Sequence, residues 1–266
     1  MSTPRFAVGS VRISAVTMAD ALQLIDDRVS SVRSAYICVT NVRTAARSQR
    51  DEEFCRIQNE SSLTVPDGLP LVWYAKLAGF TGIARVAGSD LMRAVLSVSA
   101  DRAYSHYFYG STPEVLSRMR ASLEGTYPGL NVCRFHSPPF RPLTEEETDE
   151  LVREINLLRP TFLWVGLGAP KQELLMRRLV DRLDGTILVG VGLAFDYAAG
   201  TVKRAPRWMR RCGLEWLFRC CQQPLKSRRF AIPLVWFSLV LAKALVRRVF
   251  FGKWESPAQA AVEGGA

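Results

Sequence analysis

The chain has 266 residues, of which 48% are hydrophobic, so it can bury a full core, and the composition argues against a disordered or fibrous protein. Its formal net charge is +10, from 35 basic and 25 acidic residues. Only two histidines are present, and the six cysteines form no CxxC pair, so the sequence gives no reason to expect a zinc site.

Strand and helix signals alternate along most of the chain. The predicted strands, in chain order, are residues 35–39, 63–65, 104–109, 131–135, 162–165 and 187–191. The predicted helices are residues 21–29, 43–59, 69–77, 89–99, a helix from 113, 145–158 and a helix from 171. Strands that alternate with helices imply βαβ units. We therefore expect an α/β, Rossmann-like domain over residues 1–202, with a largely parallel sheet and helices on both faces.

Polar and glycine residues follow the predicted strands. Ligands of such folds bind beyond the carboxyl ends of the strands, so these residues are candidates for binding a substrate. They are Thr40, Asn41, Asp67, Gly110, Ser111, Gly166, Gly168, Gly192 and Asp196.

Asp67 lies in the segment VPDGLP, directly after a predicted strand. Turns favour Asp and Gly for local conformational reasons, so a purely structural role is one interpretation. The other is catalytic, because a carboxylate at a strand end can act as a general base that removes a proton from an acceptor hydroxyl.

The segment FLWVGLGAPKQE, residues 162–173, reads as a strand, two glycines and the start of a helix. Gly166 and Gly168 would let backbone amides approach a phosphate, and Lys171 and Gln172 follow at the helix N-terminus. Close packing of helix on strand would explain the same glycines, so both interpretations stay open. No D-x-D motif is present, so we expect no metal and no cofactor, and a diphosphate would be met by cations such as Arg85.

Residues 203–254 carry a net charge of +12, with Glu215 as their only acidic residue, and hold four of the six tryptophans. Cations interleaved with aromatic residues suit an anionic, partly apolar surface such as a cytoplasmic membrane leaflet with anionic lipids. We therefore expect a basic, helical, membrane-associating C-terminal appendage over 203–254 and a flexible tail over 255–266. A solvated basic face packed on the main domain is the alternative.

The expected location of the protein in the cell follows from two features that the sequence lacks, a secretory signal and a membrane-spanning stretch. The first residues show no secretory signal, and no stretch reaches the roughly 20 apolar residues that span a bilayer. The run 230–242 is apolar but contains Pro233, and it would lie on a membrane and not cross it. We expect a cytoplasmic protein, peripheral on the inner face of the cell membrane.

Eight segments in order resemble the WecG/TagA/CpsF family of bacterial glycosyltransferases, glycosyltransferase family 26. They are Asn41, PDG at 66–68, RVAGSDL at 85–91, FYGSTPEV at 108–115, SPPF at 137–140, GLGAPKQE at 166–173, FDYAAGTVKRAP at 195–206 and GLEWLFR at 213–219. The resemblance covers roughly residues 5–230, and the apolar extension after residue 230 lies beyond it.

The resemblance implies an inverting, metal-independent transfer of a sugar from a UDP-sugar to a polyprenyl-diphosphate-linked saccharide, in cell-surface polysaccharide synthesis. It places the catalytic base at Asp67 and an essential arginine at Arg85. It adds Gly88, Ser89 and Asp90 to the substrate-binding positions found from the strand ends, and it also assigns Thr40 and Gln172 to substrate binding. It also implies appendage arginines that cover the active site, here Arg204, Arg207, Arg211 and Arg219.

Other functions are less consistent with the sequence. A non-catalytic membrane- or nucleic-acid-binding protein would use the basic residues 203–254. These residues follow an α/β domain whose strand ends already carry a full set of candidate ligand-binding residues, so we expect no nucleic acid as a partner. An NAD-dependent oxidoreductase would need a GxGxxG segment with an acid about 20 residues on, which is missing. The donor sugar stays open among N-acetylmannosamine, its uronic acid, glucose and glucuronic acid, and so does homo-oligomerisation.

Overall fold

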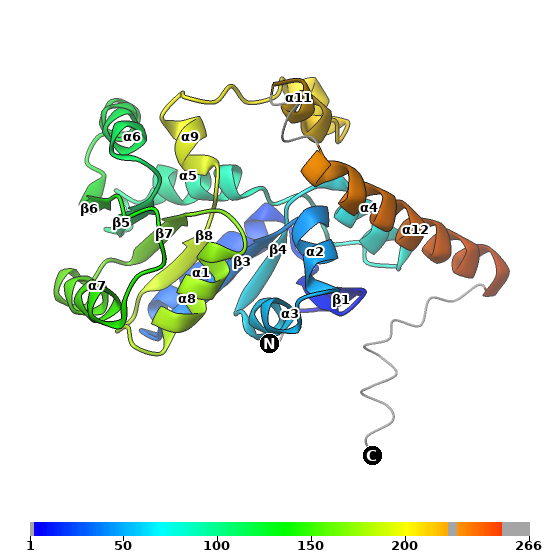
Figure 1. Cartoon of the computed structure of the whole chain (residues 1–266), viewed down its shortest axis with the longest axis horizontal. Helices are drawn as coiled ribbons and strands as arrows, with labels where there is room; N and C mark the ends of the chain where they lie inside the picture. Colours follow the sequence, from blue (N-terminus) through cyan, green and yellow to red (C-terminus); the bar gives the residue numbers. More distant parts are fainter. Residues whose placement is uncertain (1–2, 223–227, 252–266) are drawn as a thin grey trace, which may run out of the picture. The chain divides into compact units, whose positions relative to one another are not determined.

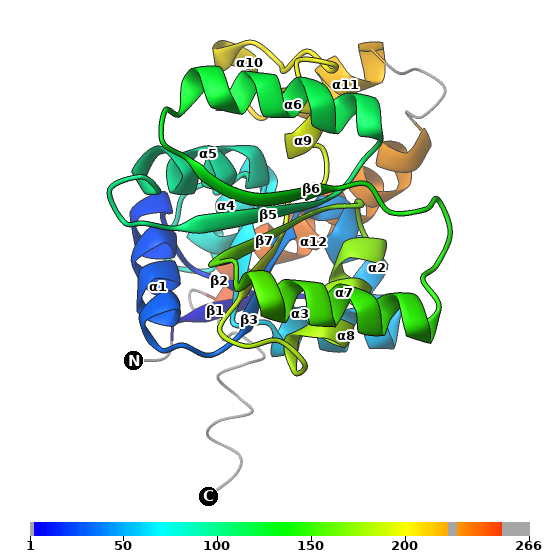
Figure 2. The same ribbon diagram turned by 90° about the vertical axis from the view of Figure 1, so that its left-hand side faces the viewer.

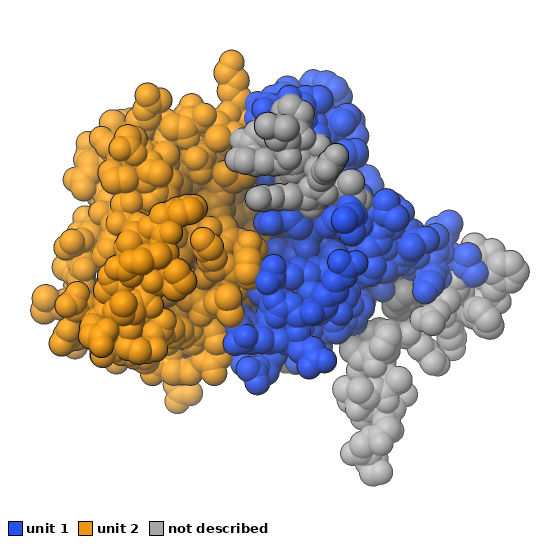
Figure 3. Space-filling model, viewed as in Figure 1, with its two compact units in different colours: residues 1–19, 40–87, 205–266 blue, residues 20–39, 88–204 orange. Residues whose placement is uncertain are grey.

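The computed structural model describes residues 3–222 and 228–251, which divide into two compact units (Figure 3). Unit 1 comprises Met1–Ala19, Thr40–Ala87 and Ala205–Ala266, as far as these are described; unit 2 comprises Asp20–Val39 and Gly88–Arg204. The segment that follows Arg204 thus belongs to the same unit as the N-terminal residues. The expected tail over 255–266 lies outside the described residues, and the expected division into core and appendage stays a prediction.

The strands form two sheets. A six-stranded sheet has the order β4-β3-β8-β7-β5-β6, and β1 and β2 form a separate two-stranded sheet. The strands are β1 (Arg5–Val8), β2 (Val11–Ser14), β3 (Ala35–Thr40), β4 (Leu63–Pro66), β5 (Ser105–Gly110), β6 (Asn131–His136), β7 (Phe162–Gly166) and β8 (Ile187–Gly190). The pairings β3–β8, β8–β7, β7–β5 and β5–β6 are all parallel. The predicted α/β class with a largely parallel sheet is confirmed.

Unit 2 places helices on both faces of its strands. Its helices are α1 (Met18–Ser30), α5 (Gly88–Val98), α6 (Pro113–Thr126), α7 (Glu145–Leu158), α8 (Lys171–Val180) and α9 (Ala194–Ala198). Helices α5, α6 and α9 cover one face, and α7 and α8 cover the other (Figure 2). Because both faces are covered, β7 and β8 are apolar and buried along almost their whole length, as expected of parallel strands.

The parallel register brings two strand ends of unit 2 together. Strands β5 and β7 are paired from His106 opposite Phe162 to Gly110 opposite Gly166. The segments that follow these strands therefore leave the sheet side by side. This is the edge at which ligands of parallel α/β folds bind.

Unit 1 is built around the β1–β2 hairpin. Its helices are α2 (Val42–Ser48), α3 (Glu52–Glu60), α4 (Leu69–Leu77), α10 (Arg207–Arg211), α11 (Glu215–Gln222) and α12 (Arg228–Phe251). The inward residues of the hairpin, Phe6, Val8, Val11 and Ile13, are buried together with Tyr74 of α4 and with Phe237 of α12. Helix α12 packs against α2 and α4 (Figure 1), so it is part of the core of this unit.

The structure corrects the predicted helix over residues 43–59. Two helices replace it, because α2 ends at Ser48 and α3 begins at Glu52. Asp51 lies between them with an extended backbone and caps α3, since its side chain accepts a hydrogen bond from the backbone N–H of Phe54. The hairpin of β1 and β2 was not among the predicted strands.

Candidate functional site

Backbone hydrogen bonds of these residues and their neighbours bring three of the predicted positions close together within unit 1. Thr40 ends β3, Asp67 follows β4, and Arg85 precedes α5. The N–H of Asp67 donates to the carbonyl of Thr40 at 2.7 Å, and the N–H of Val86 donates to the carbonyl of Pro66 at 2.9 Å. The backbone next to Asp67 is therefore held on one side by the end of β3 and on the other by the residue after Arg85. This brings Thr40, Asp67 and Arg85 to one place in the fold.

The side chain of Thr40 is turned into the interior. It is fully buried, and its hydroxyl donates to Oε1 of Gln58 on α3. Nε2 of Gln58 in turn donates to Oγ of Ser48 at 2.7 Å. The observed role of Thr40 is thus to tie the end of β3 to α2 and α3, and its predicted contact with a substrate stays a prediction.

Asn41 caps helix α2. Its Oδ1 accepts hydrogen bonds from the backbone N–H groups of Arg43 at 3.0 Å and Thr44 at 3.2 Å. The Thr44 hydroxyl accepts in return from the N–H of Asn41 at 2.8 Å, which completes a capping box. The residue therefore has a structural function that the sequence analysis did not assign.

Arg85 pairs with a residue of the C-terminal segment. Its Nη1 lies 2.8 Å from Oε2 of Glu215 on α11, and the two side chains are only 15% and 17% exposed. The other carboxylate oxygen, Oε1, lies 3.3 Å from Nη2 of Arg219 one helical turn later. Arg219 thus meets Arg85 through a shared carboxylate, whereas Arg207 and Arg211 are exposed on α10.

Two of the candidate glycines, Gly110 and Gly166, are closely packed within unit 2. A Cβ atom on Gly110 would lie 2.7 Å from the backbone carbon of Gly166, and a Cβ on Gly166 would lie 2.6 Å from the ring of Phe195. Gly110 also has φ of +130°, which side chains rarely adopt. At Gly166 the contact with Phe195 of α9 supports the packing interpretation. Gly168 differs, because its φ is +76° and a Cβ there would meet no atom within 4 Å.

Gln172 joins the two glycine loops of unit 2. Its Oε1 accepts hydrogen bonds from the backbone N–H groups of Gly168 and Gly192, each at 3.1 Å. Its Nε2 donates to Oε1 of Glu173 at 2.9 Å, and the side chain is buried. The geometry makes Gln172 a clamp that fixes the loop after β7 against the loop after β8.

Asp90 and Arg204, both predicted to face ligands, are paired with each other in unit 2. The guanidinium donates to both carboxylate oxygens at 2.6 and 2.7 Å, and it also lies 5.7 Å from the ring centre of Tyr197. Such a bidentate pair fixes the connection between α9 and α10 onto α5. Ser89 is half-buried beside it, and Asp196 accepts a hydrogen bond from the hydroxyl of Thr201 at 3.4 Å.

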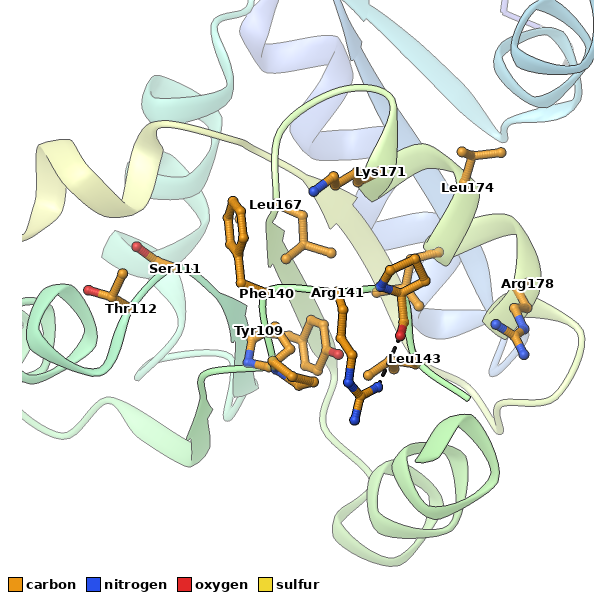
Figure 4. A pocket seen from close by; sticks show the side chains of 15 residues that line it. Tyr109, Ser111, Thr112, Phe140, Arg141, Leu143, Leu167, Lys171, Leu174 and Arg178 are labelled. Carbon is orange, nitrogen blue, oxygen red and sulfur yellow. Dashed lines mark hydrogen bonds between the residues drawn. The ribbon is translucent and has the colours of Figure 1, made fainter. Parts of the chain in front are cut away.

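A cavity of about 390 Å³ opens at the ends of β5 and β7 in unit 2 (Figure 4). Its floor includes Tyr109, Gly166 and Leu167, and one wall is the proline-rich segment from Pro138 to Leu143. The remaining lining comes from the two residues before α6 and from one side of α8, namely Ser111, Thr112, Lys171, Leu174, Leu175 and Arg178. The cavity is thus mainly apolar, with helix N-termini and cations at its edge.

The charged groups around this cavity have distinct partners. Lys171 lies 4.9 Å from the ring centre of the fully exposed Phe140. Arg141 binds Glu147 through two hydrogen bonds at 2.6 and 2.7 Å, and this contact lowers the pKa of Glu147 to about 2. Burial raises the pKa of Tyr109 to about 12, so its hydroxyl is neutral at physiological pH. The SPPF motif therefore lies in the wall of a cavity, which its sequence did not indicate.

The candidate residues therefore occupy both units. Unit 1 carries Thr40, Asn41, Asp67, Arg85, Arg207, Arg211 and Arg219. Unit 2 carries Gly88, Ser89, Asp90, Gly110, Ser111, Gly166, Gly168, Lys171, Gln172, Gly192, Asp196 and Arg204. Over residues 3–222 and 228–251, no group of three His, Cys, Asp or Glu side chains is arranged to hold a metal ion.

Comparison with known proteins gives one family and several relatives. Residues 6–249 match the model of the glycosyl transferase WecG/TagA/CpsF family. An N-acetylglucosaminyldiphosphoundecaprenol N-acetyl-beta-D-mannosaminyltransferase of Bacillus subtilis (strain 168) is 25% identical over 231 residues, which is 87% of each chain. A protein of the same description from Staphylococcus aureus (strain MW2) is 24% identical over 219 residues, 82% of this chain and 84% of its own.

Proposed function

Because the chain belongs to the WecG/TagA/CpsF family of glycosyltransferases, we propose that it moves a sugar from a UDP-sugar to a polyprenyl-diphosphate-linked saccharide, with inversion and without a metal. The observation that carries this proposal is the pair of backbone hydrogen bonds that brings Asp67 and Arg85 to one place in unit 1. A carboxylate and a guanidinium at one strand edge are the two groups that a single displacement at a sugar diphosphate requires.

In the proposed mechanism the carboxylate of Asp67 removes the proton of the acceptor hydroxyl. The hydroxyl oxygen forms a bond to the anomeric carbon of the donor sugar, while the bond from that carbon to the phosphate oxygen breaks. Since attack and departure occur on opposite faces, the configuration inverts. UDP leaves with its bonding electron pair, and the positive charge of Arg85 stabilises the negative charge that develops on the diphosphate.

The cavity of unit 2 has the size and lining of a small-molecule site. Its volume of about 390 Å³ is in the range of such sites, and its apolar lining with few polar groups is typical of them.

The relatives indicate which substrates to test first. Their names describe transfer of N-acetylmannosamine to N-acetylglucosaminyldiphosphoundecaprenol. We therefore rank N-acetylmannosamine first among the donor sugars left open by the sequence, and a lipid-diphosphate-linked N-acetylglucosamine first among acceptors.

A peripheral association with anionic membrane lipids completes the proposal. Ile232, Val235, Leu239 and Val246 of α12 are all more than half exposed, while Phe237 on the same helix is buried. Together with the +12 charge of residues 203–254, this apolar face suits a helix lying on an anionic surface. In the part of the chain that the structure describes, no helix is long and apolar enough to span a membrane. Flotation with anionic lipid vesicles, but not with purely zwitterionic ones, is the expected result.

The test of the activity is transfer from a panel of UDP-sugars to a short-chain lipid-diphosphate-N-acetylglucosamine in the presence of EDTA. Asp67→Asn should lower kcat by about 10²- to 10⁴-fold, because the variant keeps the shape of the side chain but not its basicity. Asp101→Asn is the matched control, since Asp101 is exposed in the turn after α5, and it should leave kcat unchanged. Full activity of Asp67→Asn at saturating donor would refute the assignment of the base. No transfer by the wild-type protein from any donor would favour a non-catalytic binding role.

A further inference from the structure

The path of the chain into helix α11 is set by backbone geometry. Helix α10 ends at Arg211, Cys212 is its C-cap, and Gly213 follows with φ of +75°. The N–H of Leu214 donates to the carbonyl of Met209 at 2.8 Å, and the N–H of Gly213 donates to that of Arg210 at 3.4 Å. These two bonds form a Schellman motif, which fixes the direction in which α11 leaves.

The turn at Gly213 packs against helix α4 within unit 1. A Cβ atom on Gly213 would lie 3.2 Å from Cη2 of Trp73 and 3.5 Å from Cβ of Leu69. The turn therefore packs against α4 without room for a side chain. Helix α11 begins two residues later, so its first turn is held at a defined place beside the segment that carries Arg85.

Glu215 lies in the first turn of α11, and its carboxylate forms ion pairs with two arginines. Oε2 contacts Nη1 of Arg85 at 2.8 Å, and Oε1 contacts Nη2 of Arg219 at 3.3 Å. Arg219 is 31% exposed, while Arg85 and Glu215 are about half as exposed, so solvent screens the Arg85 pair less than an ordinary surface ion pair. Glu215 is also the only acidic residue between 203 and 254.

We propose that Glu215 is a positioning residue of the transfer reaction, which aims the guanidinium groups of Arg85 and Arg219 at the diphosphate of the donor. This inference rests on the proposed function. A guanidinium carries five N–H groups, so a bond to Glu215 is compatible with further bonds to phosphoryl oxygens. Two arginines that share one carboxylate keep a net positive charge, and their geometry is fixed before the substrate binds.

Glu215 acts through Arg85, so the effects of removing the two side chains should not add. We expect Glu215→Ala to lower kcat by about 10- to 100-fold, with a change in the donor KM of no more than about threefold, because misplacing a group that stabilises the transition state lowers kcat. In an Arg85→Ala background, the same substitution should lower kcat by a smaller factor than in the wild type, because only the orientation of Arg219 is then lost. Glu215→Gln keeps an oxygen acceptor but no charge, and it should fall between wild type and Glu215→Ala.

The experiment measures kcat and donor KM for the wild type, for Glu215→Ala, Glu215→Gln and Arg85→Ala, and for the double variant that lacks Glu215 and Arg85. The thermal stability of each protein is measured as well. Asp181→Asn is the matched control, because Asp181 also pairs with an arginine four residues away, Arg177, at 2.5 Å, but at the far end of α8. If transfer by Arg85→Ala is below detection, Arg85→Lys, which keeps a cation at this position, replaces it in the cycle.

The outcomes separate this inference from the proposed function. Non-additive losses, with folded variants and an unaffected Asp181→Asn, support the positioning role. Additive losses, an unchanged kcat in Glu215→Ala, or a faster Glu215→Gln would each overturn it, the last by showing that Glu215 competes with the diphosphate. A wild-type protein that transfers no sugar from any donor would overturn the proposed function, and this role of Glu215 with it.

Discussion

Replacement of Gln172 by alanine tests whether this side chain serves the fold or only a substrate. The sequence assigned it to substrate binding, whereas the structure shows its Oε1 accepting from the N–H groups of Gly168 and Gly192, each at 3.1 Å. Its Nε2 also donates to Glu173 at 2.9 Å. The alanine variant loses all three hydrogen bonds. It also leaves a gap beside Gly190, because a Cβ atom on Gly190 would lie only 2.9 Å from Nε2 of Gln172.

The size of the effect follows from these bonds. A buried polar group that loses its partner costs about 1–3 kcal/mol. The two glycine N–H groups are only partly buried, so water can replace part of the loss, and the lower end of that range applies to each. We therefore expect Gln172→Ala to lower the free energy of unfolding by about 2–3 kcal/mol, which corresponds to a fall in Tm of about 5–10 °C for a protein of this size.

Urea and thermal denaturation of wild type and variant measure this difference directly. Gln23→Ala is the matched control, because Gln23 makes one exposed hydrogen bond to Asp27 and should change stability by less than about 0.5 kcal/mol. A Gln172→Ala protein with the Tm of the wild type, but without transfer activity, would refute the clamp. It would show that the amide contributes only through a bound substrate.

Two further predictions concern the edge of the cavity and the packing beneath it. Because Arg141 lowers the pKa of Glu147 from 4.5 to about 2, the ionised carboxylate stabilises the protein above pH 4.5, and this stability is lost as the pH falls toward 2. The urea midpoints of wild type and Glu147→Gln should therefore differ at pH 7 and converge near pH 2; a constant difference would contradict the ion pair. Gly166→Ala should destabilise by about 1–3 kcal/mol because its Cβ would lie 2.6 Å from the Phe195 ring. The control Gly125→Ala, in an open helical position, should stabilise by about 0.5–1 kcal/mol, and equal effects of the two substitutions would refute the packing argument.

Much of the fold could be predicted from local patterns. Helices α4 and α7 begin and end at the predicted residues, and the predicted strands match observed strands to within a residue or two at each end. These elements carry their own signals, such as the proline at the start of α6 and the apolar runs of β7 and β8. The predicted helix over 43–59 was wrong because no Gly or Pro marks the short break at which Asp51 caps α3.

The β1–β2 hairpin was missed although its signal is present. Gly9 and Ser10 separate two short segments in which apolar and polar residues alternate, and Gly9 has φ of +62°. The segments have only four residues each, so their alternation is weak evidence without the core that covers them. That core includes α12, which comes more than 200 residues later in the chain.

The residues alone indicated most strands and helices in their order, the family, and Asp67 and Arg85 as candidate catalytic residues. What the polar groups contact could be seen only in the folded chain: Gln172 clamps two loops, Asp90 binds Arg204, and Glu215 binds Arg85. The last two pairs join residues 114 and 130 positions apart. Local signals arise from neighbours in the chain and can be read there, but a charged side chain pairs with whichever partner the folded backbone brings within a few ångströms.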